Sequence, residues 1–283
     1  MSEQSIPMPN AQRADLERQV IQARKDRLRG ERRSRLMLGL AGLLVFLLLW
    51  EAAPRLIPGV NPLMFPPPTA VAHTFWTMTV DGEIWPHVWA SLGRVLAGFA
   101  IGASAGILLG VLTGAGIKMR HFSDPVLHGL RSIPVIAIVP LAIVWLGLGD
   151  IAKIVLIAWG VFFPVWVNTF IGIQNVPESY QRSASTMGAN RLQLMFLVSL
   201  PAALPFVFAG LRQATSLSFV VLVAAELAGA EQGLGFLISY SHLVFRIDMM
   251  IVGLLYLGAL GFLADQFFVT LLRKLFPWYL GNR

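Results

Sequence analysis

The sequence predicts an all-α polytopic membrane protein with six transmembrane helices. Of its 283 residues, 56% are hydrophobic and only 13% are charged, whereas a soluble domain carries about a quarter charged residues. The apolar residues gather in long runs that suit helices crossing a bilayer. The strict alternation that marks the strands of a membrane barrel is absent. Helices satisfy their backbone hydrogen bonds internally, so they are the expected spanning structure.

The first 35 residues form a basic arm. Nine of the 22 lysines and arginines precede Leu36. Positive charge beside a first apolar run indicates that this end lies in the cytoplasm, where it also suits contact with anionic lipid. The net charge of +7 is therefore read as a topology signal, and we expect no nucleic-acid partner.

The first predicted span covers residues 36–57, with Glu51 near its outer end. A stiff stretch follows and contains Phe65-Pro66-Pro67-Pro68. Thr69 is then placed to cap a short amphipathic helix that ends near Thr79.

The second predicted span, residues 88–113, carries a stripe of glycines at intervals of four. Small residues at this spacing let another helix backbone approach closely. The stripe consists of Gly98, Gly102, Gly106, Gly110 and Gly114. Residues 102–106 also match the G-x-S-x-G pattern of serine hydrolases, but that motif needs a strand–turn–helix context, which a membrane span does not provide.

The third predicted span, residues 124–148, contains Pro134 and Pro140. Prolines bend a membrane helix and free carbonyl groups, which is tolerated where protein or a water-filled cavity takes them up. A lining of a transport path and a simple packing kink both fit this pattern. The fourth span covers residues 151–173.

A polar stretch, residues 178–200, separates the fourth span from the fifth. Pro177 and Glu178 are typical of a helix start, and Gly188 suits a left-handed turn. A second, amphipathic helix is expected from Leu192, and Pro201 marks entry into the next span.

The fifth span is expected over residues 204–228 and the sixth over 248–272, with 276–283 as a tail. Residues 229–247 are too short and polar to span, and their glycines suggest a tight turn or partial re-entry. Six spans place both termini in the cytoplasm. In this count Lys118, Arg120 and Arg131 belong to the cytoplasmic side.

Among the charged residues within the predicted spans, four are singled out: Glu226, Asp265, Arg94 and Arg212. A charge at mid-span costs about 2.5 kcal/mol or more, so each is a functional candidate. A guanidinium can hold an anionic substrate through paired hydrogen bonds, and Glu226 would then orient a cation or serve a gate. Structural pairing near a helix end is the alternative.

Several chemistries are excluded or unsupported. There is no cysteine, and the five histidines show no metal-ligand spacing. ATP hydrolysis by a phosphate loop needs Gly-Lys-Ser/Thr, and none of the four lysines follows a glycine. We therefore predict no catalytic residue, no metal site, no cofactor bound by this chain and no enzymatic activity.

The polar stretch resembles the EAA motif, EAA-x3-G-x9-I-x-LP, of bacterial ABC-importer permeases. Four positions match the motif, namely Ala184, Gly188, Leu200 and Pro201. Three others differ: Arg182 replaces the glutamate, Ser183 the first alanine and Val198 the isoleucine. The segments FPPPTAV, ASLGRVLAGFAIG, RSIPVIAIVPLAIVWLGLGD and VAAELAGAEQGLGFLI extend the likeness over most of residues 60–275, to permeases of the nitrate/taurine/aliphatic-sulfonate/bicarbonate group.

The resemblance implies a type I ABC-importer permease fold in the bacterial cytoplasmic (inner) membrane. It implies that residues 178–200 form a coupling helix that docks on an ATPase subunit, which binds the ATP and Mg²⁺. It also implies a homodimer of this chain, two such ATPase subunits and an external or periplasmic solute-binding protein. The solute expected from the resemblance is taurine or an aliphatic sulfonate, moved by alternating access, with nitrate or bicarbonate as the alternative.

Two other function classes were weighed. A self-contained secondary transporter would show inverted repeats and coupling-ion acids near mid-span; no convincing repeat is visible and the acids are few. An intramembrane enzyme would need a nucleophile, metal ligands or a carboxylate pair at helical spacing, and the sequence contains none of these arrangements.

Overall fold

The computed structural model describes residues 10–57, 59 and 61–276, and within these ranges every regular element is a helix. The chain separates into two compact units, residues 1–69 and 70–283. Among the described residues, five helices are long and apolar enough to cross a membrane, or six when a bent pair counts as one span. The prediction of an all-α membrane fold is therefore confirmed.

In the first unit a single helix, α1 (Asn10–Leu56), carries both the described part of the basic arm and the first predicted span. Its apolar part, Ser34–Leu56, is exposed over most of its length, and Pro54 near its end is buried. Thr69 does not cap the next helix as predicted, because α2 (Pro68–Val80) already begins one residue earlier. Instead the backbone N–H and the hydroxyl of Thr69 donate to the carboxylate of Glu51, at 3.1 and 2.9 Å.

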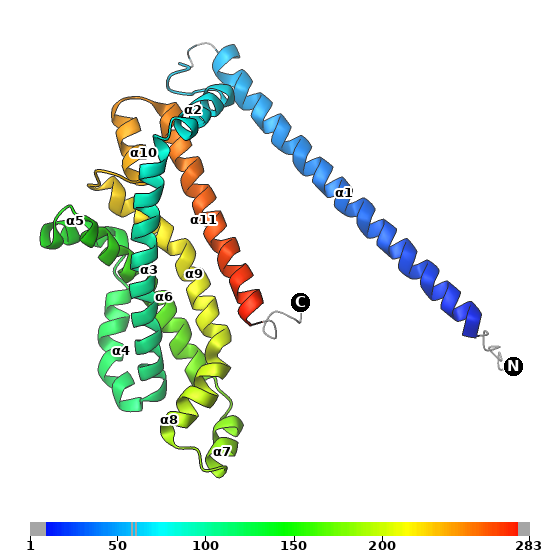
Figure 1. Ribbon diagram of the computed structural model, residues 1–283, viewed down its shortest axis with the longest axis vertical. Helices are drawn as coiled ribbons and strands as arrows, with labels where there is room; N and C mark the ends of the chain where they lie inside the picture. Colours follow the sequence, from blue (N-terminus) through cyan, green and yellow to red (C-terminus); the bar gives the residue numbers. More distant parts are fainter. Residues whose placement is uncertain (1–9, 58, 60, 277–283) are drawn as a thin grey trace. The chain divides into compact units, whose positions relative to one another are not determined.

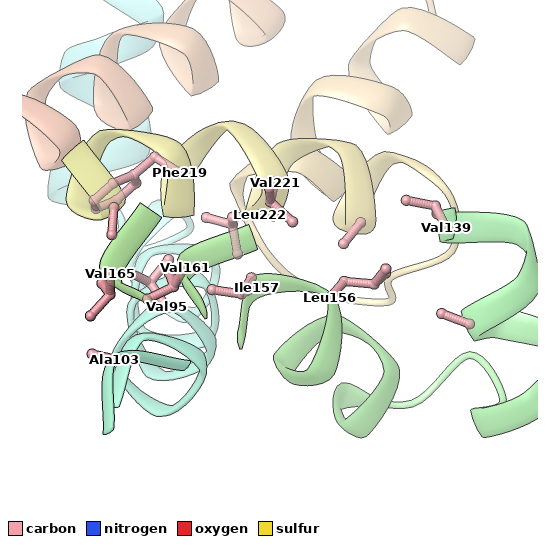
Figure 2. Packing of buried hydrophobic residues seen from close by; sticks show 13 residues of the cluster. Val95, Ala103, Val139, Leu156, Ile157, Val161, Val165, Phe219, Val221 and Leu222 are labelled. Carbon is pink, nitrogen blue, oxygen red and sulfur yellow. The ribbon is translucent and has the colours of Figure 1, made fainter. Parts of the chain in front are cut away.

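The second unit is built around three helices that run side by side: α3 (Ile84–Ala115), α6 (Asp150–Gln174) and α9 (Leu200–Leu227). Their facing sides hold the apolar core, to which α5 also contributes. Figure 2 shows these side chains converging from the four helices, including Val95 of α3, Ile157 and Val161 of α6 and Leu222 of α9. Apolar side chains on the outer surfaces remain exposed, as expected for a protein that faces lipid.

The third predicted span is two helices rather than one. α4 (Ile117–Arg131) and α5 (Val135–Leu146) meet at an angle of 95°. Pro134 lies at this break, where it precedes the first residue of α5, and its fixed φ angle of −59° suits that position. Pro140 lies inside α5, so only the first of the two prolines marks the break.

The polar stretch begins as predicted with a short helix, α7 (Glu178–Thr186). After the turn, α8 (Arg191–Gln193), a π-helical segment η1 (Leu194–Ser199) and α9 follow without interruption. Pro201 therefore does not separate a second surface helix from a span, because one helical run extends over Arg191–Leu227. Proline is tolerated there because it stands in the first turn of α9.

Two helices complete the second unit. α10 (Leu234–Leu243) fills the segment predicted as a tight turn or partial re-entry, and α11 (Ile247–Leu275) is the last apolar helix. α10 packs on both α9 and α11. Two hydroxyl contacts join α2 to α11: Thr74 donates to Asp248 at 2.7 Å, and Thr79 and Tyr256 lie 2.6 Å apart. Figure 1 shows α10 at one end of the α3–α6–α9 bundle and α7 at the other.

Candidate functional site

The α7 end of the bundle carries an exposed helix and turn. Every residue of α7 is at least partly exposed, and the side chain of Met187 at its end is 82% exposed. α7 packs on η1, which connects it to the start of α9. α7 is thus an exposed polar helix that a short turn separates from the helical run Arg191–Leu227.

The turn after α7 is tightly specified. Gly188 has a φ angle of +86°, which favours glycine, and its N–H donates to the Ser185 carbonyl at 3.0 Å. The N–H of Ala189 donates to the Ala184 carbonyl at 3.1 Å. Asn190 and Gln193 then cap α8 reciprocally, each side chain accepting from the other residue's backbone N–H. The turn is thus held on both sides.

The residues at the positions of the EAA motif, both those that match it and those that differ, divide between the two sides of this turn. Arg182 and Ser183 are exposed on α7, and Ala184 is half-buried beside them. The Arg182 guanidinium lies 2.8 Å from the Glu178 carboxylate one turn earlier in the same helix. Three further residues lie on the following run: Val198 and Leu200 are half-buried, and Pro201 is exposed.

A buried charge cluster lies at the α10 end. The Arg94 guanidinium lies 2.6 Å from the Glu226 carboxylate and also donates to Asp150 at 2.8 Å and to the Gln232 carbonyl at 2.6 Å. The Glu226 side chain is fully buried. One guanidinium therefore connects α3, α6, α9 and the loop before α10.

Glu226 also holds the start of α10. Its carboxylate accepts from the Ser91 hydroxyl at 2.8 Å and from the Gly235 N–H at 2.8 Å. A side chain at Gly233 or Gly235 would collide with Glu226, so these glycines make room for the carboxylate. The Ser91 hydroxyl in turn accepts from the Leu234 N–H at 2.8 Å. Both carboxylate oxygens of Glu226 therefore accept hydrogen bonds.

Arg212 and Asp265 form a separate pair between α9 and α11. Two guanidinium nitrogens donate to the two carboxylate oxygens at 2.9 and 3.1 Å. The pair lies on the surface of this chain, with 58% of the Arg212 side chain exposed. Both arginines that the sequence offered for an anionic substrate are therefore engaged with carboxylates.

The glycine stripe faces α6. A Cβ at Gly98 would lie 2.7 Å from Ile157 Cβ, and one at Gly110 would lie 2.5 Å from Thr169 Cβ. At Gly102 it would collide with the Ala158 carbonyl oxygen, and at Gly106 it would lie 2.8 Å from that of Phe162. The absence of side chains along this stripe lets α3 and α6 approach at backbone distance.

Sequence reasoning missed several residues of these sites. Ser91 stands one helical turn before Arg94 and shares its face, a spacing that could have indicated it. Asp150 and Gln232 have no comparable signal, because their approach to Arg94 depends on the tertiary fold. Arg131, which charge counting assigned to the cytoplasmic side, lies at the end of α4 beside the break, because the expected span is split there.

Together these features define a helical membrane protein with an exposed polar helix and a fixed turn at one end and a buried ion pair at the other. The family model for the binding-protein-dependent transport system inner membrane component matches residues 102–277. The chain belongs to this family: it is an ABC-importer permease, a transport subunit and not an enzyme. A self-contained secondary transporter is therefore set aside.

The chain is similar to several curated permeases. It is 34% identical to a putative aliphatic sulfonates transport permease, SsuC, of Bacillus subtilis, over 88% of this chain and 90% of the relative. It is 32% identical to the taurine transport permease TauC of Escherichia coli, over 86% and 90%. It is also 32% identical to the bicarbonate transport permease CmpB of Synechococcus elongatus, over 93% and 100%.

A solved structure shares the fold. An inward-facing conformation of the MetNI methionine ABC transporter aligns with a TM-score of 0.57, at 22% identity, over 70% of this chain and 97% of that chain. The predicted ABC-importer permease fold is thus confirmed.

Proposed function

We propose that this chain forms the membrane path of an importer for a small organic anion, taurine or an aliphatic sulfonate. The observation that carries this proposal is the similarity, over most of the chain, to permeases named for aliphatic sulfonates and taurine. Nitrate or bicarbonate is the second candidate, supported by the 32% identity to the bicarbonate permease, which equals the identity to the taurine permease. The solute class has to be decided by transport.

The working assembly that we propose contains two copies of this chain, two ATPase subunits and an external binding protein. ATPase and binding-protein partners follow from the family, while the homodimer is our proposal. The α7 end would face the cytoplasm together with both termini. The basic residues of the arm support this orientation, as do Arg273 and Lys274 in the last turn of α11.

In this assembly α7 and the Gly188 turn would dock on the ATPase. Two features support this role: the exposure of α7 and the hydrogen bonds that fix the turn. Closure of the ATPase dimer on ATP would displace α7 and, through η1, the base of α9. Such a rigid-body movement is the usual way for a transporter to switch between outward- and inward-facing states.

Of the residues predicted to line a path, Pro134 retains that role in our proposal, because it lies at the α4–α5 break. We assign Arg94 and Glu226 a structural role, in which their ion pair connects the helices at the external end. Arg212 is likewise given a structural role in its ion pair with Asp265. Pro140 would serve the shape of α5.

The test is ATP hydrolysis and solute uptake by the full complex in proteoliposomes, with taurine, alkanesulfonates, nitrate and bicarbonate offered in turn with the binding protein. We expect stimulation by the sulfonates. Stimulation by nitrate or bicarbonate alone would replace the solute and keep the permease role. If no anion stimulates hydrolysis or enters the vesicles, the proposed solute class is wrong.

A further inference from the structure

Arg131 differs from the other cations in the membrane-spanning part of the second unit. Arg94 and Arg212 are paired with carboxylates, and the Lys153 ammonium donates to the carbonyls of Leu148 and Gly149. Arg131, in contrast, has no hydrogen bond or ion pair with any residue that the structure describes. A guanidinium at membrane depth is costly enough to need a counter-charge, so a missing partner within the chain points to a ligand.

The position of Arg131 is far from the α7 end. α4 starts at that end with Ile117, and Arg131 follows 14 residues later, which corresponds to a rise of about 21 Å. One turn before Arg131, the His128 ring packs edge-on against Trp166 of α6 with centroids 5.4 Å apart. Arg131 therefore lies beside the middle of α6, at the α4–α5 break, where a broken helix typically borders a solute site in transporters.

Arg131 opens onto a pocket of about 280 Å³ between α5, α6 and α9. Asn168 of α6 and Gln213 of α9 line the same pocket and add amide groups. Their side chains approach each other at 3.5 Å, and the Asn168 amide also donates to the Pro164 carbonyl at 2.8 Å. The lining contains no aspartate or glutamate, so the pocket carries one positive charge, which matches a monoanion.

The rest of the lining is mainly apolar. Phe163, Val167 and Leu217 present hydrocarbon surface to the same space. Inorganic anions such as nitrate gain nothing from these walls, whereas a short carbon chain attached to an anionic head would be removed from water. The combination of one guanidinium, two amides and apolar walls therefore fits an organic anion better than an inorganic one.

Three other hollows among the described residues of the second unit fit the solute site less well. The hollow beside Arg94 and Lys153 is also lined by Asp150 and Glu231, so its charges oppose each other. The hollow lined by His87 and Tyr240 contains Glu83 and no lysine or arginine. The hollow lined by Arg120 and Arg191 also lacks an acidic residue, but Gln181 of α7 borders it, so it lies at the end of the bundle that we propose docks on the ATPase and not beside the α4–α5 break.

We propose that Arg131, Asn168 and Gln213 bind the anionic head of the transported solute, and that Phe163, Val167 and Leu217 enclose its carbon chain. This assignment rests on the proposed import of an organic anion and names the residues that would contact it. The guanidinium would offer two parallel N–H groups to two sulfonate oxygens, a geometry that a lysine does not reproduce.

The test is uptake by proteoliposomes containing the full complex, with saturating, unaltered binding protein so that differences arise in the permease. For Arg131→Gln we expect the initial rate of ethanesulfonate uptake to fall roughly tenfold to a hundredfold, the range for losing hydrogen bonds to a charged group. Arg131→Lys keeps the charge and should recover part of the rate. Arg273→Gln, which removes an exposed arginine at the end of α11, is the matched control.

A second pair of variants tests the apolar walls. Val167→Trp fills the pocket and should lower hexanesulfonate uptake relative to ethanesulfonate. Leu254→Trp, at an exposed apolar position of α11, should leave this ratio unchanged. An unchanged ratio in both variants would overturn the assignment of the walls.

Three outcomes separate this proposal from the one on which it rests. If the wild-type complex takes up sulfonates and Arg131→Gln matches Arg273→Gln, the pocket assignment is wrong and the proposed function stands. If Arg131→Gln and Arg131→Lys both prevent assembly of the complex, Arg131 is a subunit contact and the assignment is overturned. If the wild-type complex takes up only inorganic anions, the proposed solute and the assignment of the apolar walls fail together.

Discussion

Arg94 and Glu226, 132 positions apart in the sequence, form an ion pair of 2.6 Å in the interior of the second unit. Arg94 is 7% exposed and Glu226 is 0% exposed at the side chain. Arg94 and Glu226 each have further hydrogen-bond partners, so both buried charges are compensated. The pair fixes the α10 end of the bundle, where α3, α6, α9 and the start of α10 meet.

We predict that Glu226→Leu destabilises the permease by about 3–5 kcal/mol, the usual cost of removing one partner of a buried pair. The Asp150 and Gln232 contacts of Arg94 place the effect toward the lower value. Arg94→Met should also destabilise, because Glu226 would remain buried without its counter-charge. The measurement is thermal unfolding in detergent.

The double variant Arg94→Met/Glu226→Leu distinguishes a stabilising role of the ion pair from a gating role in transport. If the pair serves stability, the double variant should unfold above the temperature expected from adding the two single effects. Additive effects on unfolding, together with lost transport in a stable single variant, would instead support the gating role that the sequence suggested for Glu226.

The glycine stripe yields a prediction with a control in the same helix. A Cβ at Gly102 would collide with the Ala158 carbonyl oxygen, whereas nothing lies within 4 Å of one at Gly93. Gly102→Ala should therefore separate α3 from α6 and destabilise the bundle. Gly93→Ala should stabilise α3 by up to about 1 kcal/mol, because alanine favours helix.

Detergent melting of these two variants decides the point. We expect Gly102→Ala to lower the melting temperature and Gly93→Ala to raise it. If both alanines stabilise the protein, the close approach of α3 and α6 does not persist in the assembled permease.

The fold could be predicted from the sequence to the extent that it is local. Hydrophobic runs indicate apolar helices, and the glycine interval of four indicates close packing on one face of α3. The identity of the facing helix, α6, has no signal in either segment. The pairing of Arg94 with Glu226 has none either, since each residue taken alone is only a charge in an apolar run.

The break between α4 and α5 could not be predicted from hydropathy. An apolar run containing Pro134 has the same composition whether it forms a kinked span or two helices at 95°. Hydropathy also does not indicate that Arg131, at this break, lines a pocket with Asn168 and Gln213, whose proximity depends on the packing of α6 against α9.

Arg182 stands where the related motif has a glutamate, and the described partner of its guanidinium is the Glu178 carboxylate. Both side chains are about three-quarters exposed, and exposed pairs contribute little. We therefore predict that Arg182→Ala leaves the melting temperature of the permease unchanged. Any loss of ATPase binding by this variant then reports a direct contact of Arg182 with the ATPase, measurable as the affinity of the purified ATPase for the permease.

A stable Arg182→Ala variant that binds the ATPase as tightly as wild type would show that this position makes no such contact. Glu178→Ala serves as the companion variant, because it removes the same pair and keeps the arginine.

Gly188 offers the most direct test of coupling. Its φ angle of +86° is strained for a side chain, although nothing lies within 4 Å of a Cβ there. Gly188→Val should therefore act through the backbone alone: a β-branched residue at positive φ costs roughly 1–2 kcal/mol or more and would shift the turn that places α7.

Gly188→Asn is the matched control, since asparagine tolerates this region. We expect the valine variant to insert and assemble, yet to hydrolyse ATP without moving solute, while the asparagine variant transports at close to the wild-type rate. Wild-type coupling in both variants would show that this turn does not transmit the ATPase movement.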